Sequence, residues 1–161
     1  MANIFCKVAG IPGETSDDKH KDYFEVLSYQ HGVSQNSAGD TSSLGGHVAG
    51  RATHDPFTVV KYLDKSSPTL AQFCSSGKTV DSVVVEVWRH LGEHVKSMEY
   101  KMTDVVIKSI YPSGAGETVP TETVSFAYSK INWTHSQYNN QGKHQGDTKG
   151  GWDTTKNSVA S

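Results

Sequence analysis

Histidines are the side chains in this sequence that could provide metal chemistry, and the 161 residues contain eight of them. His90 and His94 have the i, i+4 spacing that would place two zinc ligands on one face of a helix. Gly92 lies between them in a predicted hairpin, where this spacing does not bring both rings to one metal ion. The others have no cysteine or histidine at ligand spacing: His20, His31, His47, His54, His135 and His144. Isolated histidines are usually structural or solvated, so the sequence predicts neither a metal site nor another cofactor.

Patterns that could indicate catalysis lack the context that the chemistry needs. Residues 76–79 (SGKT) match the end of a phosphate-binding loop, but Gln72 stands where that motif needs glycine, and a predicted helix precedes the match instead of following it. Cys74 lies near the C-terminal end of the same helix, where the helix dipole disfavours a reactive thiolate. No G-x-S-x-G turn occurs, and no spacing of acidic residues selects an acid–base pair. The sequence therefore predicts a protein that is not an enzyme.

Composition and charge narrow the class of protein further. A chain of this length suits one domain, 1–161, with a polar C-terminal tail at 139–161. A net charge of -2 argues against nucleic-acid binding. No apolar run approaches the length of a membrane span, and the N-terminus lacks the basic and apolar regions of a signal peptide. The two cysteines are expected to be reduced, buried thiols in a cytoplasmic protein, which some signal-independent machine could export.

Most of the chain is predicted to form strands. Apolar and β-branched residues alternate over 3–8, 23–33, 51–63, 80–89, 95–110 and 123–138. Proline interrupts the third of these at Asp55-Pro56. We expect bulges at 103–104 and near 128–131, where the alternation changes phase. Many short-spaced strands with one helix indicate an antiparallel barrel or sandwich, with the helix packed over one end or side.

The stretch 57–78 contains the one helix that the sequence predicts. A strand over 57–63 ends at residues 64–67, where Ser67 is placed to cap the helix and Pro68 occupies its first position. Gly77 is expected to end it in the left-handed conformation. A helix this short is stable only when it is buried against the strands.

Two segments have little apolar content. Residues 34–50 form a long Ser- and Gly-rich loop, which could be either a mobile tip or an arm that binds a partner. Residues 139–161 are expected to be loose unless a neighbour holds them, with Trp152 as their aromatic anchor. In the absence of a predicted catalytic site, such segments and the edges of the sheet suggest surfaces for protein partners, and identical subunits that meet head to tail can close into rings.

Several motifs resemble those of one family. The motifs are Lys19-His20 with 24–29 (FEVLSY) and Gly32, the run 57–70 with Cys74 and Gly77, Pro120-Thr121-Glu122 leading to Val124, Phe126, Ile131 and Trp133, and Gly151-Trp152-Asp153. Together they resemble the haemolysin-coregulated protein (Hcp) family, the tube proteins of bacterial type VI secretion. The resemblance spans nearly the whole chain, and its most specific part is 57–77.

The resemblance implies a two-sheet antiparallel β-barrel with one short helix and an extended loop. It implies a structural subunit whose hexameric rings stack into the inner tube of the secretion machine, which is related to phage tail tubes. The implied partners are other copies of the chain and the spike, sheath and effectors of the machine. Effectors would be held and protected in the lumen, as by a chaperone. The protein would lie in the bacterial cytoplasm before firing and then be secreted without a signal peptide. Some members carry a C-terminal toxin domain, which is not expected here.

The resemblance also implies two sets of functional residues. The family's extended loop, which reaches a neighbouring ring, corresponds to residues 39–50. The implied ring-stacking residues are Gly39, Asp40, Thr41, Ser42, Ser43, Leu44, Gly45, Gly46, His47 and Val48. Ser28 and Gln30 are the polar residues implied to face the lumen.

Two other functions are compatible with a β scaffold. A small-ligand carrier would need an apolar, unfilled interior, which the helix is expected to occupy or cover. A hydrolase would need a constellation of catalytic residues, which the sequence does not provide.

Overall fold

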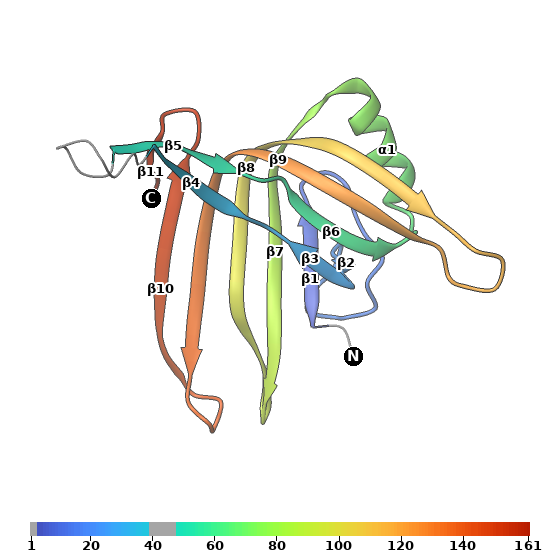
Figure 1. The fold of residues 1–161 in the computed structure, drawn as a ribbon. Helices are drawn as coiled ribbons and strands as arrows, with labels where there is room; N and C mark the ends of the chain where they lie inside the picture. Colours follow the sequence, from blue (N-terminus) through green and yellow to red (C-terminus); the bar gives the residue numbers. More distant parts are fainter. Residues whose placement is uncertain (1–2, 39–47) are drawn as a thin grey trace.

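The computed structural model describes residues 3–38 and 48–161, which form antiparallel strands and one helix (Figure 1). The elements are β1 (Ile4–Val8), β2 (Phe24–Glu25), β3 (Ser28–Gln30), β4 (Val33–Ala38), β5 (Val48–His54), β6 (Phe57–Tyr62), α1 (Ser67–Ser76), β7 (Thr79–Leu91), β8 (Glu93–Ser113), β9 (Thr121–Tyr138), β10 (His144–Asp153) and β11 (Ser158–Val159). The prediction of a mainly β, antiparallel fold with one short helix is confirmed. The predicted break at Asp55-Pro56 separates β5 from β6, and the predicted turn at Gly92, with φ of 74°, joins β7 to β8.

Nine of the strands form one strongly curved sheet. Its order is β11-β10-β9-β8-β7-β1-β2, and β6 pairs with both β9 and β3, while β4 and β5 form a separate two-stranded sheet. Two of its edge strands, β2 and β3, are successive pieces of one segment. Between them, Val26 N donates to Ile4 O (3.0 Å) and Leu27 N donates to Val60 O (2.7 Å). These hydrogen bonds hold the connecting residues on β1 and β6, but β2 and β3 do not pair with each other, so the expected barrel is not closed.

The predicted single strand over residues 23–33 is wrong, because this segment changes partner twice. Phe24 and Glu25 pair with β1, Ser28 to Gln30 pair with β6, and the chain from Val33 pairs with β5. Each change of partner breaks the strand. It also explains why both faces of the segment mix apolar and polar residues in the sequence.

The predicted changes of phase are real, but they are not bulges. The buried residues change from Val80 to Val83 in β7 and from Met102 to Val105 in β8, a spacing of three where a regular strand has two. Val83 still pairs with Met102 and Val80 with Val105, so the register is unchanged. Asp104, which lies between Met102 and Val105, has a φ of 51°. Both strands therefore contain one extra residue at the same place in the sheet.

Strand β9 takes part in the same change of face. Its buried residues change from Phe126 to Ile131, and its register with β8 stays constant from residue 126 to residue 135. The register shift between β8 and β9 lies elsewhere, between Ile107 and Ser109. The bulges expected at 103–104 and 128–131 are thus replaced by one row of residues across β7, β8 and β9. At this row, the side chains that point into the core change from one alternation to the other in all three strands.

The helix has the predicted ends but a different capping arrangement. Pro68 lies in the first turn of α1, and Gly77 ends it with a φ of 67°. Ser66, not Ser67, is the N-cap residue, and its side chain makes no capping hydrogen bond. The Ser67 hydroxyl instead donates to Glu122 Oε1 at 2.7 Å, so it ties the start of the helix to β9.

One hydrophobic core joins β1, β2, β6, α1, β7, β8 and β9. Its buried residues are Cys6, Val8, Ile11, Phe24, Val26, Phe57, Val59, Leu70, Val80, Val83, Val85, Met102, Val105, Ile107, Val124, Phe126 and Ile131. Both cysteines are free thiols; Cys6 is buried as expected, whereas Cys74 is half-buried. Burial raises the pKa of the Cys6 thiol far above its usual value, so it stays protonated.

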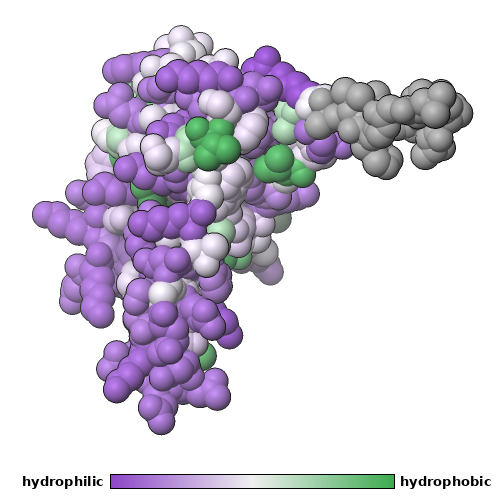
Figure 2. All heavy atoms as spheres, turned by 90° about the vertical axis from the view of Figure 1, so that its left-hand side faces the viewer, coloured by the Kyte–Doolittle hydropathy of each residue, from purple (hydrophilic) through white to green (hydrophobic). Residues whose placement is uncertain are grey.

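The C-terminal segment is ordered by its neighbours. Residues expected to be loose form β10, which pairs with β9 from His144 to Asp153, and β11, which pairs with Trp152 and Asp153. Figure 2 shows that the side of the molecule carrying β10 is mostly hydrophilic, with small separate hydrophobic patches. The low apolar content of this segment therefore reflects an exposed strand.

Gly151 allows the close approach of β10 and the C-terminal residues. A Cβ atom there would lie 2.5 Å from Ala160 O and 2.5 Å from Asn132 Nδ2. We expect Gly151→Ala to lower the free energy of unfolding by about 1–3 kcal/mol, because the backbone oxygen cannot move aside without breaking the pairing. Urea unfolding should be compared with that of Gly116→Ala, where a Cβ meets nothing within 4 Å. Equal losses for the two variants would contradict this account.

Candidate functional site

The two residues predicted to face a lumen lie on β3, and both are exposed. Ser28 pairs with Val60 and Gln30 with Thr58 on β6. Directly paired residues share a face of a sheet, so these side chains belong to one surface. Half-buried Tyr29 alternates with them and points to the other face.

The same surface continues across β9 and β8. Thr58 pairs with Ser125, and their hydroxyl oxygens are 2.9 Å apart. Ser125 pairs in turn with Ser109 on β8. We call this surface the hydroxyl face; the registers place on it Ser28, Gln30, Thr58, Val60, Tyr62, Ser109, Tyr111, Ser113, Thr121, Thr123 and Ser125. None of these residues carries a charge, and nearly all offer a hydroxyl or an amide.

Charged residues of β6 and β9 point away from the hydroxyl face into the protein. Lys61 is 0% and Glu122 2% exposed, and Lys61 Nζ lies 2.5 Å from Glu122 Oε1. The ammonium also donates to Asp64 Oδ1 at 3.0 Å and to Tyr62 O at 2.9 Å, and it lies 5.0 Å from the centre of the Phe24 ring. With Ser67 on Glu122, this network joins β6, β9 and the start of α1. It thereby fixes the strands that carry the hydroxyl face.

The β4–β5 hairpin is the arm that extends from the sheet in Figure 1. Its ladder pairs Val33 with His54, Gln35 with Ala52 and Ala38 with Val48. The predicted ring-stacking residues 39–47 lie outside the described residues, and Val48 begins β5. At the root of the arm, Arg51 Nη2 donates to Thr154 O in the turn after β10.

Aromatic rings and two histidines pack where the arm meets the sheet. The rings are Tyr29, His31, His54, Phe57, Tyr100, Tyr128 and Trp133. The hydroxyl oxygens of Tyr29 and Tyr100 are 3.1 Å apart, and His54 Nδ1 lies 2.7 Å from Tyr128 Oη. Burial raises the pKa of both Tyr100 and Tyr128, so their hydroxyls remain protonated. This root cluster places the start of the arm against β6, β8 and β9.

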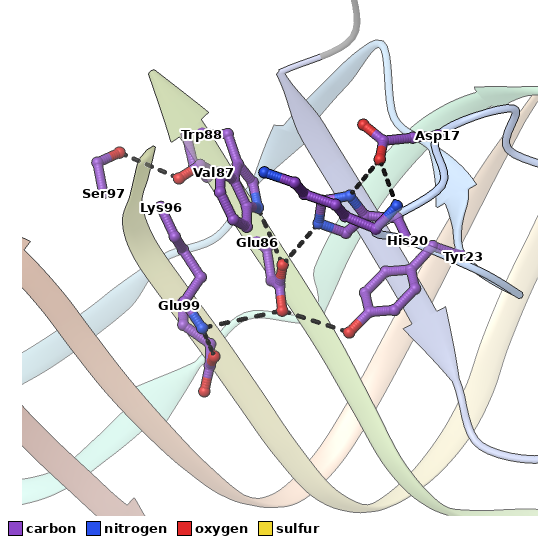
Figure 3. Close-up of polar contacts among 10 residues, drawn as sticks. Asp17, His20, Tyr23, Glu86, Val87, Trp88, Lys96, Ser97 and Glu99 are labelled. Carbon is purple, nitrogen blue, oxygen red and sulfur yellow. Dashed lines mark hydrogen bonds and ion pairs between the residues drawn. The ribbon is translucent and has the colours of Figure 1, made fainter. Parts of the chain in front are cut away.

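A second polar cluster holds the loop between β1 and β2 on the outside of the sheet (Figure 3). Glu86 on β7 is 8% exposed and lies 3.0 Å from His20 Nε2. Trp88 Nε1 donates to the same carboxylate at 2.9 Å, and the Tyr23 hydroxyl donates to it at 3.3 Å. The His20 ring stacks on Phe5 with centroids 3.9 Å apart. Burial and the Glu86 carboxylate raise the pKa of Tyr23 to about 12, so this hydroxyl remains a donor.

Two hollows on the described part of the surface are unlike the interior of a ligand carrier. One of about 370 Å³ is lined by Glu14, Thr15, Ser16, Glu25, Tyr62, Leu63 and Asp64. Another, of about 410 Å³, shares Glu14 and is lined mostly by polar and acidic residues. Both are open to solvent and bordered by carboxylates, whereas an apolar ligand needs an apolar enclosure.

Metal-ligating residues do not gather within the part of the chain that the structure describes. No group of three or more histidine, cysteine, aspartate or glutamate side chains there could hold a metal ion. His90 and His94 pair directly across the β7–β8 hairpin, as its predicted turn requires. Over the same described residues, no helix has the length and apolar character needed to cross a bilayer.

Comparison with known proteins identifies the family. The model of the family described as "Type VI secretion system effector, Hcp" matches residues 5–135. The chain belongs to the Hcp family. It is 29% identical over 158 residues to protein hcp1 of Pseudomonas aeruginosa, and the match covers 96% of each chain. Its structure is similar to that of Hcp1 from Salmonella typhimurium, with a TM-score of 0.81, 30% identity and coverage of 99% of this chain and 100% of that one. A solved structure of a type six secretion system protein has a TM-score of 0.93 at 28% identity, with the same coverage.

Membership of the Hcp family confirms the resemblance found in the sequence and connects the chain with type VI secretion. For this Hcp chain, the resemblance pointed to Ser28 and Gln30, whose lumen-facing role stays a prediction, and it did not point to the other residues of the hydroxyl face. A signal was present, since Thr58 and Ser125 alternate with apolar residues in their strands. Glu86 was missed because its partner His20 is distant in sequence, although the Lys19-His20 pair was part of the resemblance.

Proposed function

We propose that this Hcp-family protein is a structural subunit that forms hexameric rings, which stack into the inner tube of a type VI secretion system. The hydroxyl face supports this most directly. It is continuous over four strands, its paired residues are uncharged, with the exposed Lys108 in the bulge next to Ser109, and it contains both Ser28 and Gln30. A wall of this kind, facing the hole of a ring, would hydrate well and would hold a passing protein only weakly.

The remaining roles follow from the same proposal. Other copies of the chain would be its first partners, and the spike, sheath and effectors of the machine would be the others. Effectors would be bound and protected in the lumen. The protein would be made in the bacterial cytoplasm and secreted with the tube when the machine fires. Its role would be structural and not enzymatic.

Purified protein provides the direct test of ring formation. Light scattering at micromolar concentration should give the mass of six chains of 17.5 kDa each, and electron microscopy should show annular particles with a central hole. A stable interface in such a ring should bury on the order of 1,600 Å² in total. A monomer by both measurements would count decisively against the proposal.

The arm is expected to connect stacked rings. Replacing residues 39–47 with a short Gly-Ser linker should leave the ring mass unchanged and reduce the number and length of tubes severalfold, because the implied contacts to the next ring are lost. Electron microscopy would count single rings and stacks. The control shortens another turn, residues 114–118 between β8 and β9. Unchanged stacking by the arm variant would show that the arm has been assigned wrongly.

A further inference from the structure

Two histidines lie at the root of the arm among aromatic rings. The His31 ring stacks on Phe57, with centroids 5.3 Å apart, and contacts Tyr128 at 5.8 Å and Trp133 at 6.2 Å. His54, at the end of β5, stacks on Trp133 at 6.4 Å and is hydrogen-bonded to Tyr128. The two histidines therefore share two aromatic neighbours from β9. Both lie at the root of the arm, His31 before the start of β4 and His54 at the end of β5.

Neither nitrogen of His31 has a hydrogen-bond partner among the described residues, although both are buried. A neutral imidazole can occupy such a position at moderate cost, whereas an imidazolium there would be a partly buried charge that Asp55 alone offsets. Burial, and then the proximity of His54, lower the pKa of His31, while nearby Asp55 acts in the opposite direction. Burial also lowers the pKa of His54, which faces the Tyr128 hydroxyl and lines one hollow together with the cationic Arg51.

The groups around His31 do little to compensate a positive charge. The titratable groups that face it are Tyr100 from β8, Tyr128 from β9, and His54 and Asp55 at the end of β5. Both tyrosines stay protonated because burial raises their pKa. Phe57 and Trp133 do not titrate. Asp55 is the one formal negative charge of this set at neutral pH, and its residue is exposed to solvent.

We propose that His31 and His54 form an acid-released latch, which holds the root of the β4–β5 arm on the sheet at neutral pH and frees it when the two rings are protonated. The latch is a property of the single chain. Its consequence for ring stacking rests on the proposed function, because the arm is the segment expected to reach the next ring.

The direction of the pH effect follows from proton linkage. A histidine in a freed arm titrates near 6.5, whereas both latched histidines bind protons less readily. As the pH falls below about 6.5, the freed state takes up protons that the latched state does not, so the ratio of freed to latched arms rises. The rise approaches tenfold per pH unit for each histidine until the latched form is also protonated.

Hydrogen exchange of the full chain at pH 7.5, 6.5 and 5.5 tests the latch, after correction for the intrinsic pH dependence of exchange. Amides of β4 and β5 should lose protection at least fivefold between pH 7.5 and 5.5, while those of β7 and β8 should not. His31→Phe preserves a stacked ring but cannot titrate, and it should reduce this change to the part that His54 contributes. His144→Phe is the control, since His144 is an exposed histidine paired with Asp147 on β10.

Two outcomes would overturn the proposal: pH-independent protection of the arm in the unmodified chain, or an unchanged pH effect in His31→Phe. If that variant does not fold, a nuclear magnetic resonance titration of the unmodified chain decides instead, and a pKa of His31 at or above 6.5 refutes the latch. Ring mass measured on the same samples at pH 7.5 tests the proposed function separately. Missing rings would count against that function alone, and unchanged arm protection against the latch alone.

Discussion

Lys61→Ala is expected to lower the free energy of unfolding by about 3–5 kcal/mol, the usual cost of removing one partner from a buried ion pair. Lys61 is fully buried, and its ammonium is the cation beside both Glu122 and Asp64. Its removal leaves the Glu122 carboxylate with only the Ser67 hydroxyl among these groups. Urea unfolding at pH 7.5 measures the loss, with Lys65→Ala, an exposed lysine nearby, as the matched control.

A double variant separates the charge from its surroundings. Lys61→Met combined with Glu122→Met removes both members of the pair and fills similar volume with apolar atoms. It should recover most of the stability lost in Lys61→Ala, because no unpaired charge remains between β6 and β9. A double variant as unstable as Lys61→Ala would show that the pair with Glu122 does not account for the loss, and would assign it to the other partners of the ammonium, Asp64 and Tyr62 O.

Glu86→Ala is expected to destabilise the protein by about 3 kcal/mol, from the cost of leaving buried hydrogen-bonding groups without partners. The carboxylate accepts from Trp88 and Tyr23 and contacts His20. Without it, the Trp88 and Tyr23 donors lose their acceptor and His20 keeps only Asp17, at 3.3 Å, so the loop between β1 and β2 should detach from the sheet. Urea unfolding gives the loss of stability, and limited proteolysis shows whether the loop has become accessible.

Glu99→Ala provides the comparison for Glu86→Ala. Glu99 is half-buried on β8 and pairs with Lys96 at 2.6 Å, so its loss leaves a cation that water can reach. We expect Glu99→Ala to lower the free energy of unfolding by less than about 1 kcal/mol, as for other partly exposed ion pairs. Equal effects of the two variants, or a loop as resistant to protease in Glu86→Ala as in the unmodified chain, would contradict the assigned role of Glu86.

Sequence reasoning succeeded where structure is decided locally. Pro68 and Gly77 set the ends of the helix, and the alternation of Phe57 and Val59 predicted β6. It failed where pairing with a neighbouring strand determines whether a segment forms a strand. Residues 144–153 have few residues with a high strand propensity, yet β9 holds them as β10. The segment 23–33 has good propensity throughout, yet its three successive partners divide it.

The candidate site was predictable in part. Ser28 and Gln30 came from the resemblance, whereas the rest of the hydroxyl face depends on which strands are neighbours, which alternation alone does not reveal. The buried ion pair did leave a signal. Lys61 is in phase with inward-facing Phe57 and Val59 in one strand, and Glu122 is in phase with apolar residues in another. Opposite charges at inward positions of two strands can be read as a prediction that those strands pair.

The row in which three strands change face runs through Asp81 of β7, Asp104 of β8 and Ser129 of β9, because Ser82 pairs with Thr103 and Thr103 with Lys130 just beside it. This row has a consequence for how the chain tolerates changes in length. Deleting Asp104 alone would invert the inside and outside of half of β8 relative to its neighbours, and would expose Met102 or Val105 to water. Only deletions made at all three positions together would keep every apolar residue of these strands buried. Single-residue length changes should therefore be far rarer here among surviving variants than point substitutions, even though two of the three positions are aspartates and none is part of the hydrophobic core.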